Sequence, residues 1–376
     1  MRNKILKAFI YFSGFICLYG FLATRFLPLY NLVSTEKEVP GYWDNTTYGE
    51  LYYFNNIKHF REDLPGAMPK FQWSEDHPEL EEAEILTFGD SFIDWSRHEQ
   101  ISSRLQDALG VPVYTHYGEY PYEYLKKNNY QNGKPKYLVY LRTERWIPIT
   151  FGQDPLYSPS KKEKENPNSH PLKKNLAAFR DFLFDNRTEE LYRALLQRSY
   201  ITSYFSTLIS TWKFELFGYI SSLTPKYAIT EEKPWLFYVD QVNDKSSSFY
   251  YQHSESELNE ITENIKKLSE HLWKEYKLKF VFVPVPSKFT IYHHLVDPDA
   301  EYNEFLPRLY KELDRLEILY VDLYEPFRKS EEYVFYGTDD HWTEHGVSVA
   351  KDVLKKKIIE SSLYSENCLF TKLVTK

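Results

Sequence analysis

The chain has 376 residues, of which 42% are hydrophobic and 27% are charged, as in an ordinary folded protein with one large domain or two smaller ones. Its formal net charge of −8 argues against nucleic-acid binding, because such binding needs a basic surface that replaces counterions. The only two cysteines are Cys17 and Cys368, which excludes a disulfide framework in the body and a cysteine-built metal site.

The N-terminal part of the chain contains an uncharged run over residues 8–24, just long enough for a helix that crosses a membrane. Basic residues precede it, so the positive-inside rule places the N-terminus in the cytoplasm and the body outside. A cleaved signal peptide and a buried core helix are the alternatives. We expect residues 1–25 to form an uncleaved signal anchor, followed by a proline-interrupted tether over residues 26–80.

Five short apolar runs follow, with the length and composition of buried strands. They cover residues 84–88, 111–115, 137–141, 279–283 and 318–322. Helical patterns lie between several of them, for example at Ile101, Leu105 and Leu109. Alternating strands and helices predict an α/β fold, in which a parallel sheet has helices on both faces and binds ligands at the carboxyl ends of its strands.

The third and fourth predicted strands are too far apart in the chain for a simple crossover. We therefore predict an inserted loop and helical subdomain over residues 151–254, and one α/β domain formed by residues 81–150 and 255–376. The insert contains the aromatic stretch SYITSYFSTLISTWKFELFGYI, residues 199–220. This stretch could pack on the body, lie on a membrane or meet a partner, and packing on the body is the simplest expectation.

The stretch LTFGDSFIDW, residues 86–95, ends the first predicted strand at Gly89-Asp90-Ser91. A hydroxyl nucleophile needs a base within hydrogen-bond reach, a group that orients the base, and donors for the developing oxyanion. Ser91 is well placed for this role, since it lies between a buried strand and a predicted helix whose amides could face its hydroxyl. Gly, Asp and Ser are also ordinary turn residues, so the triplet alone decides little.

A candidate base occurs far downstream, in the stretch YGTDDHWTEHG over residues 336–346. His341 precedes a predicted C-terminal helix and can reach the carboxyl edge of the sheet from there. Asp339 can accept a proton from the other ring nitrogen of the histidine, and Asp340 is the alternative acid. The competing interpretation is an ordinary helix entry with a surface histidine.

Taken together, G-D-S-F and T-D-x-H-W resemble the motifs of the SGNH/GDSL hydrolase superfamily. The Asp-x-His spacing is similar to that of the branch containing alginate O-acetyltransferases of the AlgJ/AlgX type. LVYLRTERWIP, with Glu144 and Arg145, and FVFVPVPSKFTIY, residues 280–292, are also like this branch. The resemblance covers about residues 80–150 and 255–360. It implies an SGNH/flavodoxin-like parallel sheet of about five strands, flanked by helices.

The resemblance also implies the roles of individual residues. Ser91, His341 and Asp339 form the catalytic triad, and the backbone amides of Ser91 and Gly118 are the expected oxyanion donors. Arg145 is a further candidate donor, although it could equally pair with an acid. The superfamily's G-x-N-D block is absent after the third strand. In the alginate enzymes the Asp–His pair precedes the serine, whereas here the serine comes first, as in ordinary SGNH proteins.

Four further residues complete the predicted site. Asp90 and Trp342 adjoin the nucleophile and the base, and we expect them to contribute to the oxyanion or substrate site. Tyr117 lies with other tyrosines at the expected rim, where it either stacks on a sugar or packs locally. Lys288 either binds an acidic sugar or is a plain loop residue.

The resemblance implies an O-acyltransferase, most simply an O-acetyltransferase, that acts on a cell-envelope or exported polysaccharide. Its expected place is the bacterial inner membrane, with a single pass and the catalytic domain in the periplasm. An integral-membrane acyltransferase would supply the acyl group, and no metal or organic cofactor is required. The alternatives are an esterase acting on glycans or lipids, and a non-catalytic envelope assembly protein.

Overall fold

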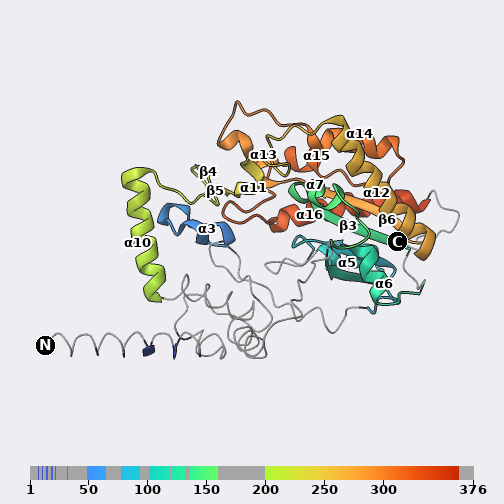
Figure 1. Cartoon of the computed structure of the whole chain (residues 1–376), viewed down its shortest axis with the longest axis horizontal. Coiled ribbons are helices and arrows are strands. Elements are labelled where there is room, and N and C mark those ends of the chain that lie inside the picture. Colours follow the sequence, from blue (N-terminus) through green and yellow to red (C-terminus); the bar gives the residue numbers. More distant parts are fainter. Residues whose placement is uncertain are drawn as a thin grey trace, which may run out of the picture.

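The computed structural model of the chain describes residues 49–64, 78–93, 101–118, 120–131, 136–159 and 200–363, with isolated positions between residues 7 and 32. Its centre is a sheet of four parallel strands in the order β2-β1-β3-β6 (Figure 1). These strands are β1 (Ile85–Gly89), β2 (Val113–Tyr117), β3 (Tyr137–Thr143) and β6 (Lys279–Val285). They confirm four of the five predicted strands, with ends that differ by one or two residues.

The prediction of a full fifth strand is wrong. Residues 318–322 make only a single parallel bridge to the sheet, between Phe282 and Tyr320. The chain leaves the sheet edge at once because the carboxylate of Asp322 accepts a hydrogen bond from the Tyr324 amide at 2.8 Å. This bond begins the short helix α15 (Tyr324–Arg328) and so ends the extended conformation.

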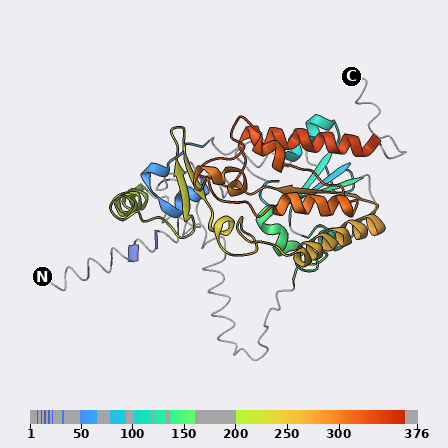
Figure 2. The same cartoon turned by 90° about the horizontal axis from the view of Figure 1, so that it is seen from above.

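Helices cover both faces of the sheet because the buried side chains of each strand alternate between two apolar clusters. On β3, for example, Val139 and Leu141 pack into one cluster and Leu138 and Tyr140 into the other. Figure 2 shows α16 on one side of the sheet and α12 on the other. The first cluster includes side chains of α5 (Ile101–Leu109) and α16 (Glu344–Leu363); the second includes those of α6 (Pro121–Lys127), α7 (Ile147–Phe151), α12 (Glu255–Tyr276) and α14 (Phe305–Arg315).

The position of β1 determines where a ligand can bind. Because β1 lies between β2 and β3, the chain connections on its two sides run in opposite directions across the sheet. Parallel sheets bind ligands at the carboxyl ends of their strands beside such a reversal. Gly89 lets β1 approach β3 closely there, since a Cβ at this position would lie 2.4 Å from the Leu141 carbonyl oxygen. Ser91 follows β1 at this edge.

A second lobe is built from parts of the predicted tether and the predicted insert. The tether contributes α3 (Glu50–Asn55) and a 3-10 turn (Lys58–Phe60); the insert contributes α10 (Tyr200–Phe217) and the antiparallel strands β4 (Lys226–Ile229) and β5 (Pro234–Phe237). Buried side chains such as Leu51, Phe60 and Leu236 hold these pieces together. The described part of the insert is therefore helical only in part. The β4–β5 hairpin forms because Thr230 and Lys233 close a tight turn between the strands.

The predicted membrane anchor over residues 1–25 lies mostly outside the described residues, as do residues 160–199 of the insert. Within the described part of the chain, no helix combines the length and the apolar character needed to cross a bilayer. The predicted division of the chain into an anchor, a tether, an α/β domain and an insert stays a prediction.

Candidate active site

Ser91, His341 and Asp339 form a chain of hydrogen bonds at the carboxyl edge of the sheet. Ser91 Oγ lies 2.7 Å from His341 Nε2, and His341 Nδ1 lies 2.7 Å from Asp339 Oδ1. The backbone N–H of His341 donates to the same carboxylate oxygen at 3.1 Å, which fixes the acid against the ring. With Nδ1 donating to Asp339, Nε2 is left to accept the proton of the serine hydroxyl. Asp339 and His341 are buried, and Ser91 is half-buried.

The neighbouring acid, Asp340, belongs to a different network. Its carboxylate accepts from Gln241 Nε2 at 2.8 and 2.7 Å and forms an ion pair with Arg145. Burial raises the pKa of Asp340, but the charges of Arg145 and Lys288 and the bond from Gln241 outweigh burial and hold this pKa below its usual value. Asp339 is therefore the acid that bonds His341, whereas Asp340 helps to hold the loop over residues 337–341 in place.

Lys288 is fully buried beneath the loop that carries Asp339 and His341. Its Nζ donates to the carbonyl oxygens of Gly337 at 3.1 Å and Asp339 at 2.9 Å, and lies 3.8 Å from Asp340 Oδ1. Burial lowers the pKa of Lys288 to about 8, against the opposing charge of Asp340. Neither sequence-based interpretation of Lys288 fits, since a buried amine that binds carbonyls is neither a sugar ligand nor a plain loop residue.

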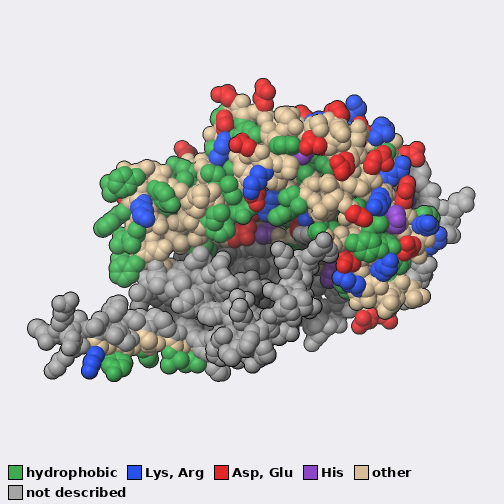
Figure 3. Space-filling model, in the orientation of Figure 1, with side chains coloured by type: hydrophobic (Ala, Val, Ile, Leu, Met, Phe, Trp, Pro, Cys, Tyr) green, Lys and Arg blue, Asp and Glu red, His purple; other side chains and the backbone are tan. Residues whose placement is uncertain are grey.

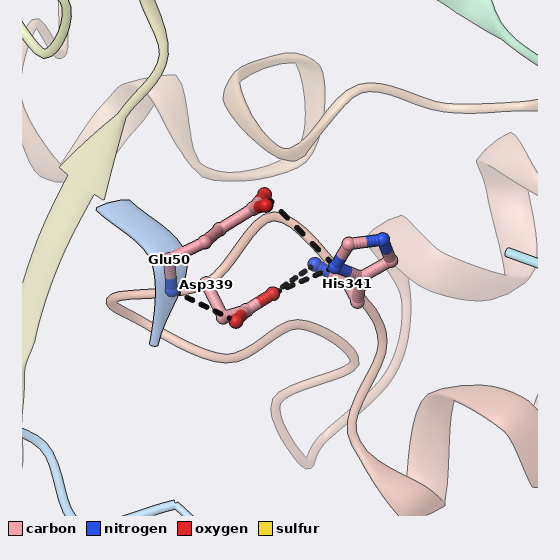
Figure 4. Close-up of side chains that lie close together, drawn as sticks. All are labelled: Glu50, Asp339 and His341. Carbon is pink, nitrogen blue, oxygen red and sulfur yellow. Dashed lines mark hydrogen bonds and ion pairs between the residues drawn. The ribbon is translucent and has the colours of Figure 1, made fainter. Parts of the chain in front are cut away.

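Glu50 is a third acid at the site, and sequence reasoning missed it. Its backbone N–H donates to Asp339 Oδ2 at 3.1 Å, and its carboxylate lies 4.0 Å from His341 Nδ1 (Figure 4). Burial, and then the charge of Asp339, raises the pKa of Glu50 to about 7. Gly49 makes the approach possible, since its φ is +82° and a Cβ there would lie 2.3 Å from the Thr338 carbonyl oxygen.

Both segments of the second lobe hold the loop over residues 337–341. From the tether, the Glu62 carboxylate accepts from the amide and the hydroxyl of Thr338 at 2.8 and 3.0 Å. From the insert, the Leu236 amide of β5 donates to the Gly337 carbonyl at 2.9 Å. The loop is thus positioned by parts of the chain that carry no recognisable motif.

The predicted oxyanion donors differ in whether another group already occupies them. Among the described residues, the Ser91 amide has no hydrogen-bond acceptor, so it can donate to an oxyanion. The Gly118 amide instead donates to the Gly89 carbonyl at 2.9 Å, as a continuation of the pairing between β1 and β2, so its prediction as a donor is wrong for this geometry. Arg145 pairs with Asp340, which is the alternative that the sequence left open.

Asp90 has a structural position next to the serine. Its Oδ2 accepts from the amide of Thr143 at 2.9 Å and from the hydroxyl of Thr143 at 2.5 Å. The same carboxylate accepts from the Phe92 amide at 3.3 Å through its other oxygen. Asp90 therefore ties the end of β1 to the end of β3 and holds the turn that presents Ser91. The predicted helix directly after Ser91 is a turn over residues 91–93, and residues 94–100 lie outside the described ranges.

Of the two aromatic candidates, Tyr117 lies on the surface and Trp342 lies in the core. Tyr117, at the end of β2, is 60% exposed, and its predicted contact with a sugar stays a prediction. Trp342 is buried, with ring centroids 4.8 Å from Phe92 and 5.6 Å from Phe327. Its predicted role in substrate binding does not fit, because its ring packs beneath the serine turn and away from solvent.

Glu50, Asp339 and His341 each offer one potential metal-ligand atom, and these atoms lie within 4.8 Å of one another. Within the described ranges no other set of histidine, cysteine and acidic side chains is gathered in this way. An ion bound there would have to replace the 2.7 Å bond between Asp339 and His341. The donor set thus suits an oriented imidazole better than a metal centre.

A four-stranded parallel sheet flanked by helices, with Ser91, His341 and Asp339 at its carboxyl edge, fits the SGNH hydrolase-like class. Residues 230–368 match the family described as SGNH hydrolase-like domain, acetyltransferase AlgX. This match confirms the resemblance to the AlgX-type branch and supports an acetyltransferase-like SGNH function. It includes the Asp–His loop but not Ser91. Searches of curated proteins and of solved structures gave no significant match to the chain.

Proposed function

We propose that the protein is a membrane-anchored, extracytoplasmic O-acyltransferase of the SGNH type. It transfers an acyl group, in the simplest case acetyl, to a hydroxyl of a cell-envelope or exported polysaccharide. The observation that carries this proposal is the pair of 2.7 Å contacts that link Ser91, His341 and Asp339, in a chain whose C-terminal part matches an acetyltransferase family.

The reaction follows from the roles that these three side chains can take. Ser91 Oγ attacks the carbonyl carbon of the donor ester while His341 Nε2 accepts the hydroxyl proton, and the carboxylate of Asp339 stabilises the imidazolium. His341 then protonates the departing alcohol, which leaves an acyl group on Ser91. An acceptor hydroxyl loses its proton to His341, attacks the acyl carbon and frees the serine. Transfer and hydrolysis differ only in whether a sugar hydroxyl or water makes this second attack.

The surroundings of His341 raise its pKa and so make the neutral ring a stronger base. Burial lowers the pKa of His341, but the hydrogen bond to Asp339 and the charges of Asp339 and Glu50 outweigh burial and raise it above its usual value. A general base works best when its pKa lies near the working pH. We place the domain in the periplasm, where an integral-membrane acyltransferase supplies the acyl group.

The first experiment tests the acyl-serine. The purified full-length protein is incubated with p-nitrophenyl acetate, quenched in acid, digested and analysed by mass spectrometry. One acetyl group is expected on Ser91 of the wild type, and none at this position in Ser91→Ala. Ser103→Ala, on α5, is the matched control and should be acetylated like the wild type. Turnover of the ester by Ser91→Ala at the wild-type rate would contradict the proposal.

A second experiment separates transfer from hydrolysis. The acylated protein is given oligosaccharide acceptors, and the release of free acetate is compared with the formation of acetylated sugar. Acetylated sugar that requires Ser91 supports transfer, whereas only free acetate across a range of acceptors supports the esterase alternative. Full polysaccharide acylation in cells that carry Ser91→Ala would support an assembly protein.

A further inference from the structure

Helix α10 presents a row of apolar side chains to solvent, and two of the side chains on its inner side are threonines. The exposed apolar side chains are between 49% and 80% exposed; they are Tyr204, Phe205, Ile209, Trp212, Leu216 and Phe217, called here the α10 apolar face. Thr207 and Thr211, on the inner side, are buried, and Phe214 packs on Phe60 with ring centroids 5.4 Å apart. A helix on the surface of a soluble domain has the opposite arrangement.

The chemistry of this face favours lipid over a protein partner. Figure 3 shows hydrophobic side chains gathered over α10, and the helix carries only one basic and one acidic residue, Lys213 and Glu215. Tyr204 and Trp212 on the face, with the exposed Tyr219 just beyond the helix, are of the two residue types enriched where a bilayer meets water. Protein interfaces surround their apolar centre with polar, hydrogen-bonding groups, which are scarce here.

The place of α10 in the chain points to the same surface. The Lys58 amide donates to Thr211 Oγ1 at 3.0 Å, so α10 is fixed to residues 49–64, which lie within the predicted tether (Figure 1). The part of the tether that precedes them, residues 26–48, can span at most roughly 80 Å. Described positions of the N-terminal apolar run are helical and expose Tyr11 and Phe15. A membrane that holds this run therefore lies within reach of α10.

We propose that the α10 apolar face lies in the interfacial layer of a lipid bilayer and forms a second membrane contact beside the predicted N-terminal anchor. The proposal rests on the membrane-anchored placement under Proposed function, but not on the chemistry of Ser91. A single anchor lets a domain rotate, whereas two contacts fix its orientation. The lobe that carries α10 also positions the Asp339–His341 loop through Glu62 and Leu236, so the same contact would hold the site at a set height above the membrane.

The test uses the full-length protein with both native cysteines replaced by serine and one new cysteine, labelled with the environment-sensitive dye NBD. Phe205→Cys reports on the α10 apolar face, and Glu263→Cys, exposed on α12, is the control that shares the same anchor. The proteins are inserted into phosphatidylethanolamine–phosphatidylglycerol vesicles, with or without nitroxide-labelled lipid. A blue-shifted emission that the nitroxide lipid quenches several-fold more at position 205 than at position 263 is the expected result.

Equal emission and equal quenching at the two positions would overturn the proposal. A response at position 205 that needs added membrane proteins would also overturn it, and would point to a protein partner instead. Because the vesicles contain only lipid, the experiment distinguishes direct contact with lipid from binding to a membrane protein. Each labelled protein is also assayed with a soluble ester, so that failure of the Ser91 chemistry is seen independently of failure of the lipid contact.

Discussion

The carboxylate of Glu50 lies 4.0 Å from Nδ1 of His341, beside the Asp339 oxygen that already bonds this nitrogen at 2.7 Å. Two acids thus face one imidazole. Burial opposes protonation of His341, but the bond and charge of Asp339, followed by the charge of Glu50, raise the pKa of the ring above its ordinary 6.5. Since only the neutral ring can accept the proton of Ser91, activity should rise with pH through this raised pKa.

Replacing Glu50 by Gln should move the acid limb of the pH profile to lower pH. The substitution keeps the size of the side chain and the backbone bond to Asp339 but removes one negative charge from beside His341. Glu50 carries this charge near and above its pKa of about 7, so in that range the pKa of His341 falls in the variant and more of the ring is neutral. The measurement is kcat/KM for a soluble ester between pH 5 and 9. Glu263→Gln, exposed on α12, should leave the profile unchanged; a shift of the Glu50→Gln limb to higher pH would refute the assignment.

Asp339→Asn and Asp340→Asn should have different consequences, although the residues are adjacent. The first variant loses the acceptor that orients His341, so kcat should fall by about three to four orders of magnitude. The second removes one partner of a buried ion pair with Arg145, so its main cost should be about 3–5 kcal/mol of unfolding free energy.

The comparison combines urea unfolding with kcat measured at a temperature where both variants are folded. A folded Asp340→Asn protein with the same loss of kcat as Asp339→Asn would show that the orienting acid has been assigned wrongly.

Lys288→Met should destabilise the protein and change how its stability depends on pH. The variant leaves Asp340 without one of its buried cations and two carbonyls without their donor, at a cost of about 3–5 kcal/mol. In the wild type, the folded pKa of Lys288 of about 8 lies below the ordinary 10.5. Between these values the unfolded chain binds the extra proton, so this group makes stability rise with pH.

Urea unfolding of both proteins at several pH values across this window measures the contribution. The difference in unfolding free energy between wild type and Lys288→Met should widen as the pH increases. A difference that stays constant across the window would mean that Lys288 has an ordinary pKa in the folded protein.

The local features of the fold could be predicted from the sequence, but the contacts between segments far apart in the chain could not. Strands β1, β2, β3 and β6 were found because each coincides with a short apolar run, and α5 because Ile101, Leu105 and Leu109 repeat with a helical period. The strand expected over residues 318–322 has the same apolar character, but Asp322 begins a helix there. Composition alone does not distinguish these outcomes.

The candidate site divides in the same way. Ser91, Asp339 and His341 were found because two short motifs carry them, and the parallel sheet brings both motifs to one edge. Glu50 is 289 residues from Asp339 and stands in no motif, so only the folded chain shows that its backbone and carboxylate reach the site. Gly118 was misassigned because the sequence does not show that the ladder between β1 and β2 uses its amide.

Gly49→Ala tests whether the tether segment holds the catalytic loop, and Gly218→Ala is its matched control. Both glycines have positive φ angles, +82° and +63°, so each variant costs about 1–3 kcal/mol in backbone strain, with the larger cost at Gly49, whose ψ of 152° lies outside the left-handed α region. Only the new Cβ at position 49 collides with the chain, 2.3 Å from the carbonyl oxygen of Thr338, while nothing lies within 4 Å of the one at position 218.

Gly49→Ala must therefore move Glu50 away from Asp339, and kcat for a soluble ester should fall at least tenfold beyond any effect on stability. Gly218→Ala should lose stability from its backbone alone and keep the wild-type kcat. Urea unfolding and ester turnover of the two variants measure this difference; equal kcat values would mean that Glu50 and its segment only cover the site and do not position Asp339.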